Sequence, residues 1–241
     1  NAAVQANLGL LVERGVRIVA PDSGSLACGE EGMGRLAEPK TIFSRVQELL
    51  GLAAPADLEG FKVLVTAGGT REPIDAVRYI SNRSSGKMGY AMAAAARSRG
   101  AEVTVIAANC DLPRLPDVRY IDVSTSRELE QALKMEFAEA DILFMAAAVS
   151  DYSVSGKQTT GKIERTNDKF LQLLPISDIV SSLEAGDGAL KVGFAAEYGA
   201  SKLERARQKL KDKGLDMIVF NDVSRADIGF ESDYNEVIIV V

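Results

Sequence analysis

Five short apolar segments constrain the fold of this chain more than any other feature. They are Lys62–Thr66, Glu102–Ala107, Ile142–Ala147, Lys191–Ala195 and Met217–Phe220. Most are separated by stretches with helical spacing, which are Tyr90–Arg99, Arg127–Phe137, Ser177–Leu183 and Ser201–Lys213. Apolar strands that alternate with helices are typical of a parallel sheet covered on both faces. We therefore predict an α/β fold with a Rossmann-like, doubly wound, mostly parallel sheet and helices on both faces.

Two weaker patterns add strands outside this alternation. Val237–Val241 predicts a late strand that runs antiparallel to the others. Leu171–Leu174 alternates weakly between apolar and polar residues, and we expect it to pair with the stretch after Lys162 as a hairpin.

Ligands of doubly wound sheets bind beyond the carboxyl ends of the strands, so the loops there are candidate sites. Ala146-Ala147-Ala148 ends one strand with residues small enough for a base or ribose to approach the backbone, although tight helix packing would favour the same residues. Asp151 follows at the rim and could bind Mg²⁺ held on phosphates; an exposed loop aspartate would look the same. Phe194 could lie against a base, but such a residue is more often core.

The loop after the first strand is a candidate phosphate site. That strand stops at Gly68-Gly69, and Ser84, Ser85 and Gly86, followed by Lys87, lie where the next helix begins. Small residues there leave backbone N–H groups open, and the positive end of the helix dipole favours an anion. The loop matches neither the G-x-G-x-x-G fingerprint nor a P-loop. Alternatively, Gly68-Gly69 only turns the chain and Gly86 only breaks a strand.

Three lysines and one asparagine complete the candidate residues. Lys162 lies in a long polar loop, and such loops often bind ligands. Lys209 and Lys213 are four residues apart and share one helix face. Solvated surface lysines would give the same pattern. Asn82, within ISNRSSG, offers donor and acceptor groups to a ligand, or it only caps or turns the chain.

Composition excludes several classes of function. The chain has no histidine, which removes Ser-His-Asp triads, histidine zinc sites and histidine general bases. The net charge of −6 argues against a nucleic-acid-binding surface. No apolar run is long enough to predict a membrane span. Two cysteines form no disulfide framework, so we expect a cytoplasmic protein.

Residues 1–60 are expected to end one domain and link it to the next. Helical spacing predicts a helix over Asn1–Arg14, and Val16–Ala20 predicts a short strand. The glycine-rich stretch Asp22–Pro39 is expected to be irregular. Thr41–Leu50 predicts a second helix, after which GLAAPADLEG is typical of a linker. The chain starts without methionine, which suggests a piece excised from a longer protein.

An ordered set of motifs resembles the phosphopantothenate–cysteine ligase family, also called phosphopantothenoylcysteine synthetase. The set spans roughly residues 61 to 235, in the family's order. It consists of TAGGTREPID, VRYISNRSSGKMG, AAAVSDY, Lys162-Ile163, GFAAE, ARQK and NDV. An ordered set is more specific than any single motif.

The resemblance assigns roles to the candidate residues. It implies that Lys162 is needed for catalysis and lies at the nucleotide. It implies that Asn82 contacts the phosphopantothenate part and the acyl-cytidylate, from a loop contributed across a dimer interface, with Arg83 beside it. Residues that match the family's nucleotide site, together with the predicted phosphate loop, are Gly68, Gly69, Ser84, Ser85, Gly86, Lys87, Ala146, Ala147, Ala148, Asp151, Lys162, Asp178, Ile179, Phe194, Lys209 and Lys213.

The implied reaction joins L-cysteine to 4′-phosphopantothenate through an acyl-cytidylate. CTP is the nucleotide substrate, since the AAAVSDY and SSGKMG segments look bacterial, and bacterial members use CTP rather than ATP. Mg²⁺ is the implied metal, with Asp151 as its ligand. The family implies a homodimer through the ligase domain, and a larger homo-oligomer in the full-length bifunctional protein.

The N-terminal segment resembles the end of phosphopantothenoylcysteine decarboxylase, a flavoprotein often fused ahead of the ligase. ACGEEGMGR matches the family's flap, and Cys28 matches the flap cysteine. The FMN-binding body and the catalytic histidine lie outside this chain, so we expect no decarboxylase activity. The implied domains are the decarboxylase remnant at 1–40, a linker at 41–60 and the ligase domain at 61–241.

Two other classes of function remain open. Tyr198 and Lys202 match the Y-x-x-x-K pair of NAD(P)-dependent short-chain dehydrogenases. Against that reading, T-G-x-x-x-G-x-G is missing after the first strand, and the second strand lacks a terminal acidic residue for a ribose. The third class is a non-catalytic nucleotide-binding or scaffold domain, which predicts binding without turnover.

Overall fold

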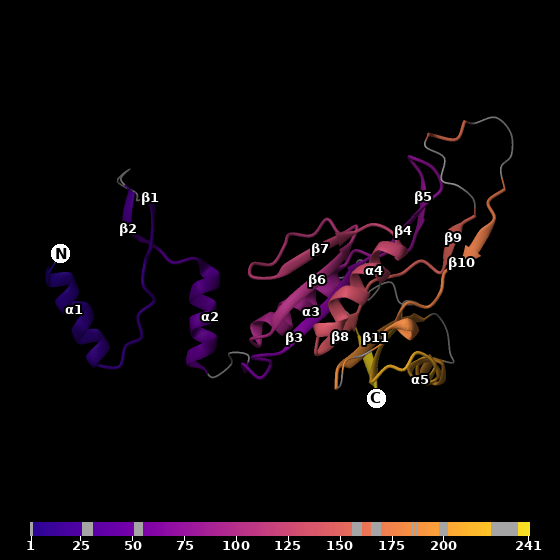
Figure 1. Cartoon of the computed structure of the whole chain (residues 1–241). Coiled ribbons are helices and arrows are strands. Elements are labelled where there is room, and N and C mark those ends of the chain that lie inside the picture. Colours follow the sequence, from indigo (N-terminus) through magenta and orange to yellow (C-terminus); the bar gives the residue numbers. More distant parts are fainter. Residues whose placement is uncertain are drawn as a thin grey trace. The chain divides into compact units, whose positions relative to one another are not determined.

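The computed structural model forms two compact units, Asn1–Pro55 and Ala56–Val241 (Figure 1). It describes residues 2–25, 31–50, 55–155, 161–164, 170–184, 186, 188–197, 202–222 and 236–241. Over these residues, no helix is long and apolar enough to cross a membrane.

The first unit contains both predicted helices, α1 (Ala2–Glu13) and α2 (Pro39–Leu49). The strand predicted at Val16–Ala20 is wrong. The strands of this unit are β1 (Asp22–Ser25) and β2 (Glu31–Arg35), which pair antiparallel within the glycine-rich stretch expected to be irregular. The reason is that a strand needs a neighbouring strand for its backbone hydrogen bonds. β1 and β2 supply these bonds to each other.

A seven-stranded sheet organises the second unit. Its strands are β3 (Lys62–Gly68), β6 (Glu102–Ala108), β7 (Arg119–Val123), β8 (Ile142–Met145), β11 (Leu190–Glu197), β12 (Met217–Asp222) and β13 (Val237–Val240). The order is β13-β12-β11-β8-β3-β6-β7, and only β13 runs antiparallel within it. The parallel strands thus follow the Rossmann order 3-2-1-4-5-6, and the strand order reverses between β3 and β8. The predicted fold class and the antiparallel last strand are confirmed.

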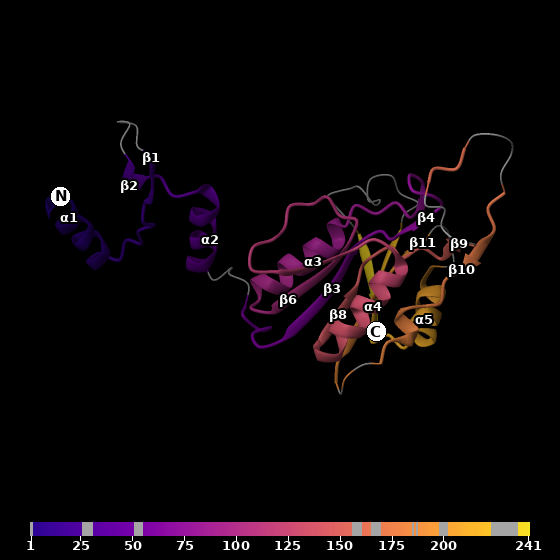
Figure 2. The same cartoon turned by 45° about the horizontal axis from the view of Figure 1, so that its top comes forward.

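Helices cover the sheet on both faces (Figure 2). On one face, Tyr90, Ala93 and Ala96 of α3 (Lys87–Ser98) pack with Val63 and Val65 of β3. On the other face, one core cluster joins α4 (Ser126–Glu136) and α5 (Lys202–Asp212) to the sheet. The helix predicted at Ser177–Leu183 is wrong in type. Only the 3₁₀ turn Val180–Ser182 forms there, and the Asp178 side chain accepts hydrogen bonds from its first N–H groups.

Two hairpins lie beyond the carboxyl ends of the strands, at the upper right of Figure 1. The first pairs β4 (Arg71–Pro73) with β5 (Tyr79–Ser81), inside what the sequence suggested was only a polar loop. The second pairs β9 (Tyr152–Val154) with β10 (Leu173–Pro175). The predicted pairing of Leu171–Leu174 with the stretch after Lys162 is therefore wrong, because β9 supplies the partner. We call these hairpins, together with residues 161–164, the arm.

Candidate nucleotide-binding site

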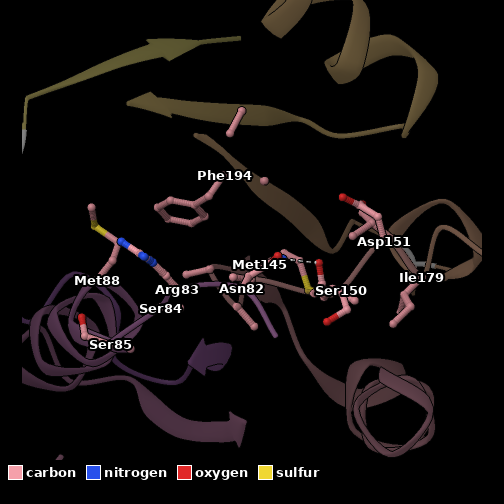
Figure 3. A pocket seen from close by; sticks show the side chains of 18 of the residues that line it. Asn82, Arg83, Ser84, Ser85, Met88, Met145, Ser150, Asp151, Ile179 and Phe194 are labelled. Carbon is pink, nitrogen blue, oxygen red and sulfur yellow. Dashed lines mark hydrogen bonds between the residues drawn. The ribbon is translucent and has the colours of Figure 1, made fainter. Parts of the chain in front are cut away.

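A cavity of about 1340 Å³ opens at the carboxyl ends of the strands (Figure 3). Its lining comes from five parts of the second unit: residues 82–88 with 90–91, 112–113, 145–151, 176–180 and 193–195. Lys209, Lys213, Leu215 and Ile218 complete it. The cavity lies where β3 and β8 meet, which is the point at which doubly wound sheets bind their ligands. The predicted rim is thus a real concave site.

Glycines fix the floor of this cavity. Gly68 has φ +85°, and a Cβ atom there would lie 2.0 Å from the Ala108 carbonyl oxygen. Gly86 has φ +80° and is the N-cap of α3; its Cβ would lie 2.6 Å from Cys110 Sγ. Both residues therefore require glycine on two grounds, backbone conformation and space. The alternative that Gly86 only breaks a strand is wrong, since it begins the helix.

The start of α3 faces the cavity with Ser84, Ser85, Gly86 and Lys87. The N-cap Gly86 has no side-chain cap hydrogen bond, and Lys87 N donates to Ser85 Oγ at 3.4 Å. The start of this twelve-residue helix lies at the cavity lining. This is a geometry that favours anions.

The loop after β8 is held by hydrogen bonds of its main-chain N–H and C=O groups. Ala147 N donates to Thr66 Oγ1 at 3.0 Å, and Ala148 N donates to the Gly68 carbonyl at 2.8 Å. Thr70 N in turn donates to the Ala148 carbonyl at 3.2 Å. Ala146, Ala147 and Ala148 all line the cavity, so small residues form this part of its wall.

Asn82 and Arg83 lie on the side of the cavity next to the arm. Asn82 Nδ2 donates to the Val149 carbonyl at 2.9 Å. This bond orients the amide of Asn82 across the mouth of the loop after β8, and it leaves Oδ1 as the acceptor toward a ligand.

The opposite side carries both predicted α5 lysines. Lys213 Nζ lies 2.8 Å from Asp178 Oδ2, and Lys209 lines the same wall. Partial burial of Asp178 opposes its ionisation, but Lys213 and the N–H groups of the 3₁₀ turn outweigh this, so the pKa of Asp178 is lowered. Asp178 is therefore a carboxylate at neutral pH, and Lys213 is its ammonium partner.

Apolar residues complete the cavity around these charges. Phe194 is half-buried and Ile179 is buried, and both line it, so Phe194 is not purely a core residue (Figure 3). Asp151 is exposed at the rim. Sequence reasoning missed Met88, Tyr90, Leu112, Pro113 and Met145. An apolar residue near a strand end or in the first turn of a helix has the same sequence pattern whether it lines a cavity or packs in the core.

A second cavity of about 360 Å³ adjoins the first and shares Asn82, Arg83, Ser84 and Ser85 with it. Gly69, Arg71, Tyr79, Ser81 and Asn109 also line it. The guanidinium of Arg71 lies 4.7 Å from the Tyr79 ring centroid. Asn109, at φ 51°, donates to the carbonyl oxygens of Gly69 and Ser124 and ties three loops together.

Several predicted residues lie away from the main cavity. Gly68 supports it from behind, and Gly69 lines only the second cavity. Lys162 is exposed and lines neither. Tyr198 and Cys28 fall outside the described residues, and Lys202, the first residue of α5, has no described side chain.

Comparison with known proteins covers nearly the whole chain. Coenzyme A biosynthesis bifunctional protein CoaBC of Escherichia coli K12 is 43% identical over 244 residues, which are 97% of this chain and 58% of that protein. The chain thus spans little more than half the length of this relative.

Solved structures agree on the fold. The C-terminal domain of a CoaBC protein superposes with a TM-score of 0.62 at 32% identity, covering 78% of this chain and 89% of that one. A Cab2 variant in complex with phosphopantothenate-cysteine gives 0.60 at 18% identity, covering 83% and 84%, and shows the shared fold alone.

The model of the DNA/pantothenate metabolism flavoprotein C-terminal domain matches residues 58–241. This match includes the whole sheet, the glycine-bearing loop and the cavity described above. With the E. coli relative, it shows that this chain belongs to the DNA/pantothenate metabolism flavoprotein C-terminal domain family.

Proposed function

We propose that residues 56–241 form a CTP-dependent phosphopantothenate–cysteine ligase. In the first half-reaction, 4′-phosphopantothenate and CTP give 4′-phosphopantothenoyl-cytidylate and pyrophosphate. The amine of L-cysteine then attacks the activated carbonyl, which gives 4′-phosphopantothenoylcysteine and CMP. The observation that supports this most is the main cavity, which joins the N-terminus of α3, the alanines after β8 and the lysines at the end of α5. The family, and its relative in coenzyme A biosynthesis, point to the same reaction.

The nucleotide lies across the main cavity. Its phosphates lie at the start of α3, where N–H groups and the helix dipole favour negative charge. Lys209 and Lys213 add cationic charge from the opposite wall. The ribose and base lie against Ala146–Ala148 and Phe194, which offer a close backbone and an aromatic face.

The first half-reaction needs charge stabilisation more than a nucleophile. A carboxylate is a poor acyl donor, and attack of its oxygen on the α-phosphate, with loss of pyrophosphate, gives it CMP as a leaving group. Lys162 offsets the charge that develops on the α-phosphate and the pyrophosphate. Asn82 holds the acyl group and keeps the mixed anhydride from water. No step requires histidine, which this chain lacks.

Mg²⁺ is the metal that we propose to accompany CTP. The carboxylates of the lining are Asp151 and Asp178, and Asp178 is already paired with Lys213. Over the described residues, no group of three or more histidine, cysteine, aspartate or glutamate side chains could hold a metal. This donor set fits Mg²⁺ if phosphate oxygens supply most ligands and Asp151 supplies one. The bound ion neutralises phosphate charge.

The second cavity suits the phosphorylated acyl substrate. Arg71 and Arg83 supply positive charge for a phosphate monoester. The cavity shares Asn82 with the main one. A substrate whose phosphate lies in the second cavity therefore brings its far end toward Asn82 and the nucleotide.

The working unit that we propose is a homodimer formed through the arm, inside a larger homo-oligomer of the full-length protein in the cytoplasm. Apolar side chains on the arm are exposed, among them Val77 at 62%, Tyr152 at 50% and Leu173 at 45%. Contiguous exposed apolar side chains mark interfaces between proteins. Lys162, which lies on the arm outside its own chain's cavity, then serves the cavity of the partner subunit.

Pyrophosphate release with CTP and 4′-phosphopantothenate, without and then with L-cysteine, tests the reaction. We expect release that depends on phosphopantothenate, and phosphopantothenoylcysteine once cysteine is present. Lys162→Gln should lower release by at least about 100-fold, because it removes a charge used in the transition state. Lys134→Gln makes the same change on the exposed side of α4 and should leave the rate unchanged. Absence of turnover with both CTP and ATP would overturn the proposal.

A further inference from the structure

The backbone of Ile163, the residue after Lys162, is held on both sides by one ion pair of the β4–β5 hairpin. Ile163 N donates to Asp75 Oδ2 at 3.1 Å. The Ile163 carbonyl accepts from Arg78 Nη2 at 2.9 Å. A peptide unit gripped at both its donor and its acceptor has little freedom to rotate or slide.

The grip is built into the turn that joins β4 and β5. Asp75 Oδ1 accepts from Val77 N and Arg78 N, both at 2.8 Å, which closes the turn. Asp75 Oδ2 accepts from Arg78 Nε at 2.9 Å and pairs with Nη2 of the same guanidinium. The Asp75 side chain is fully buried in this arrangement, whereas that of Arg78 is 49% exposed.

This buried carboxylate is stable as an anion. The hydrogen bond from the Arg78 side chain has the largest effect on the pKa of Asp75 and lowers it. Burial raises this pKa, and the N–H groups of Val77, Ile163 and Arg78 help the Arg78 side chain to outweigh burial. The pKa of Asp75 is therefore well below its usual range. A carboxylate already fixed by one side chain and one turn can accept the Ile163 N–H without reorganising.

We propose that Asp75 and Arg78 form a clamp that positions Lys162 for the reaction, an inference that rests on the proposed function. Lys162 is exposed, and a lysine side chain that must be ordered in water loses considerable rotamer freedom. Because the clamp already fixes the peptide next to Lys162, the backbone loses little further conformational entropy when Lys162 is ordered at the reaction. Asp75 and Arg78 are positioning residues, since they act on the substrate only through Lys162.

The clamp also links the segment that carries Lys162 to the strand that leads to Asn82, a residue of this chain's own cavity. Arg78 directly precedes β5, and Asn82 directly follows it. The strand is bonded to β4 along its length, and Ser81 Oγ donates to the Thr70 carbonyl at 2.8 Å. Arg78 of the clamp and Asn82 therefore lie at the two ends of one short strand, which connects the clamp on Ile163 to this chain's own cavity.

Asp75→Asn tests the clamp, because an amide nitrogen in place of Oδ2 would face the donors of Ile163 and Arg78. Arg78→Lys is the second variant, since it keeps the charge but loses the two-sided geometry. Asp117→Asn is the control: Asp117 pairs with Arg97 on the exposed surface, and its φ of 53° suits asparagine. Circular dichroism and urea unfolding establish that each variant is folded.

Two readouts separate the clamp from the reaction. Amide hydrogen exchange at Ile163 should speed up by about tenfold or more in Asp75→Asn and stay unchanged in Asp117→Asn. The kcat for pyrophosphate release should fall roughly 10- to 100-fold, while KM for CTP changes little. A misplaced Lys162 stabilises the transition state less but leaves ground-state binding of CTP nearly unchanged.

Each result has one meaning. Unchanged exchange at Ile163 in both clamp variants would overturn the clamp whether or not the protein turns over. Faster exchange with an unchanged kcat would overturn its positioning role. If the unmodified protein released no pyrophosphate, the proposed function would fail, and the role in catalysis with it, while the exchange data would still report whether Asp75 holds Ile163.

Discussion

The central sheet and the arm differ in how far their apolar residues are buried. In β3, every residue from Val63 to Gly68 is buried, whereas Leu173, Leu174 and Pro175 of β10 are all exposed. The sheet is covered by helices of its own chain, and nothing in the described part of the chain covers the apolar side of the arm. The sheet buries its apolar residues within its own chain, whereas the exposed apolar residues of the arm are the basis of the proposed dimer interface.

The largest effect expected from this comparison concerns glycine. A Cβ atom at Gly89 of α3 would lie 2.6 Å from Ala67 Cβ and 2.8 Å from the Thr66 carbonyl oxygen. Gly89→Val should therefore destabilise the fold by about 3 kcal/mol or more, since helix and strand must separate. At Gly161 of the arm, nothing lies within 4 Å of an added Cβ. Gly161→Ala should change the free energy of unfolding by less than about 0.5 kcal/mol.

Urea unfolding followed by circular dichroism measures both changes. Equal destabilisation by the two substitutions would contradict the idea that close packing is confined to the sheet layers.

An intermediate effect is expected when the arm loses its apolar surface. Replacing both Leu173 and Leu174 by serine should convert the proposed dimer to a monomer, with little change in the unfolding of the isolated chain, because both side chains are exposed there. Light scattering after gel filtration gives the mass. Leu190→Ser, another exposed leucine on the sheet, is the control and should leave the mass unchanged. A doubly substituted protein that stays dimeric would assign the interface elsewhere.

The smallest signal comes from mixing two inactive variants. One carries Lys162→Gln on the arm, and the other carries Lys209→Gln in the cavity. If Lys162 serves the partner's cavity, each mixed dimer regains one intact site, and random pairing restores about a quarter of the activity. Recovery after joint unfolding and refolding is the measurement. No recovery would mean that each chain uses its own Lys162.

Sequence reasoning reached the sheet because its signal is periodic. Continuous apolar runs such as Val63-Leu64-Val65 reflect burial on both faces, which only a covered parallel sheet provides. It missed β7, since Arg119–Val123 is only partly buried at the sheet edge and its polar residues hide the pattern. It misjudged the region of Ser177–Leu183 because the Asp178 side chain supplies a local alternative to helical hydrogen bonds.

The candidate site was found unevenly for a similar reason. Residues at strand ends and at a helix start, such as Ala147 and Gly86, could be located from the order of elements alone. The second cavity and the clamp could not, because they depend on hairpin pairing and on a bond between Asp75 and Ile163, which are far apart in the sequence. Long-range contacts of single side chains leave no periodic trace.

The ion pair between Lys213 and Asp178 has a consequence for the order of events in a catalytic cycle. A lysine that already has a carboxylate 2.8 Å away gains little from exchanging it for a single weak anion. A chain of three phosphates offers several charges at once and also reaches the start of α3. On the proposed function, the site therefore takes up a triphosphate more readily than it retains the monophosphate product. The ion pair of the empty cavity thus disfavours binding of the product CMP. When CMP leaves, Lys213 pairs again with Asp178, which has stayed in place.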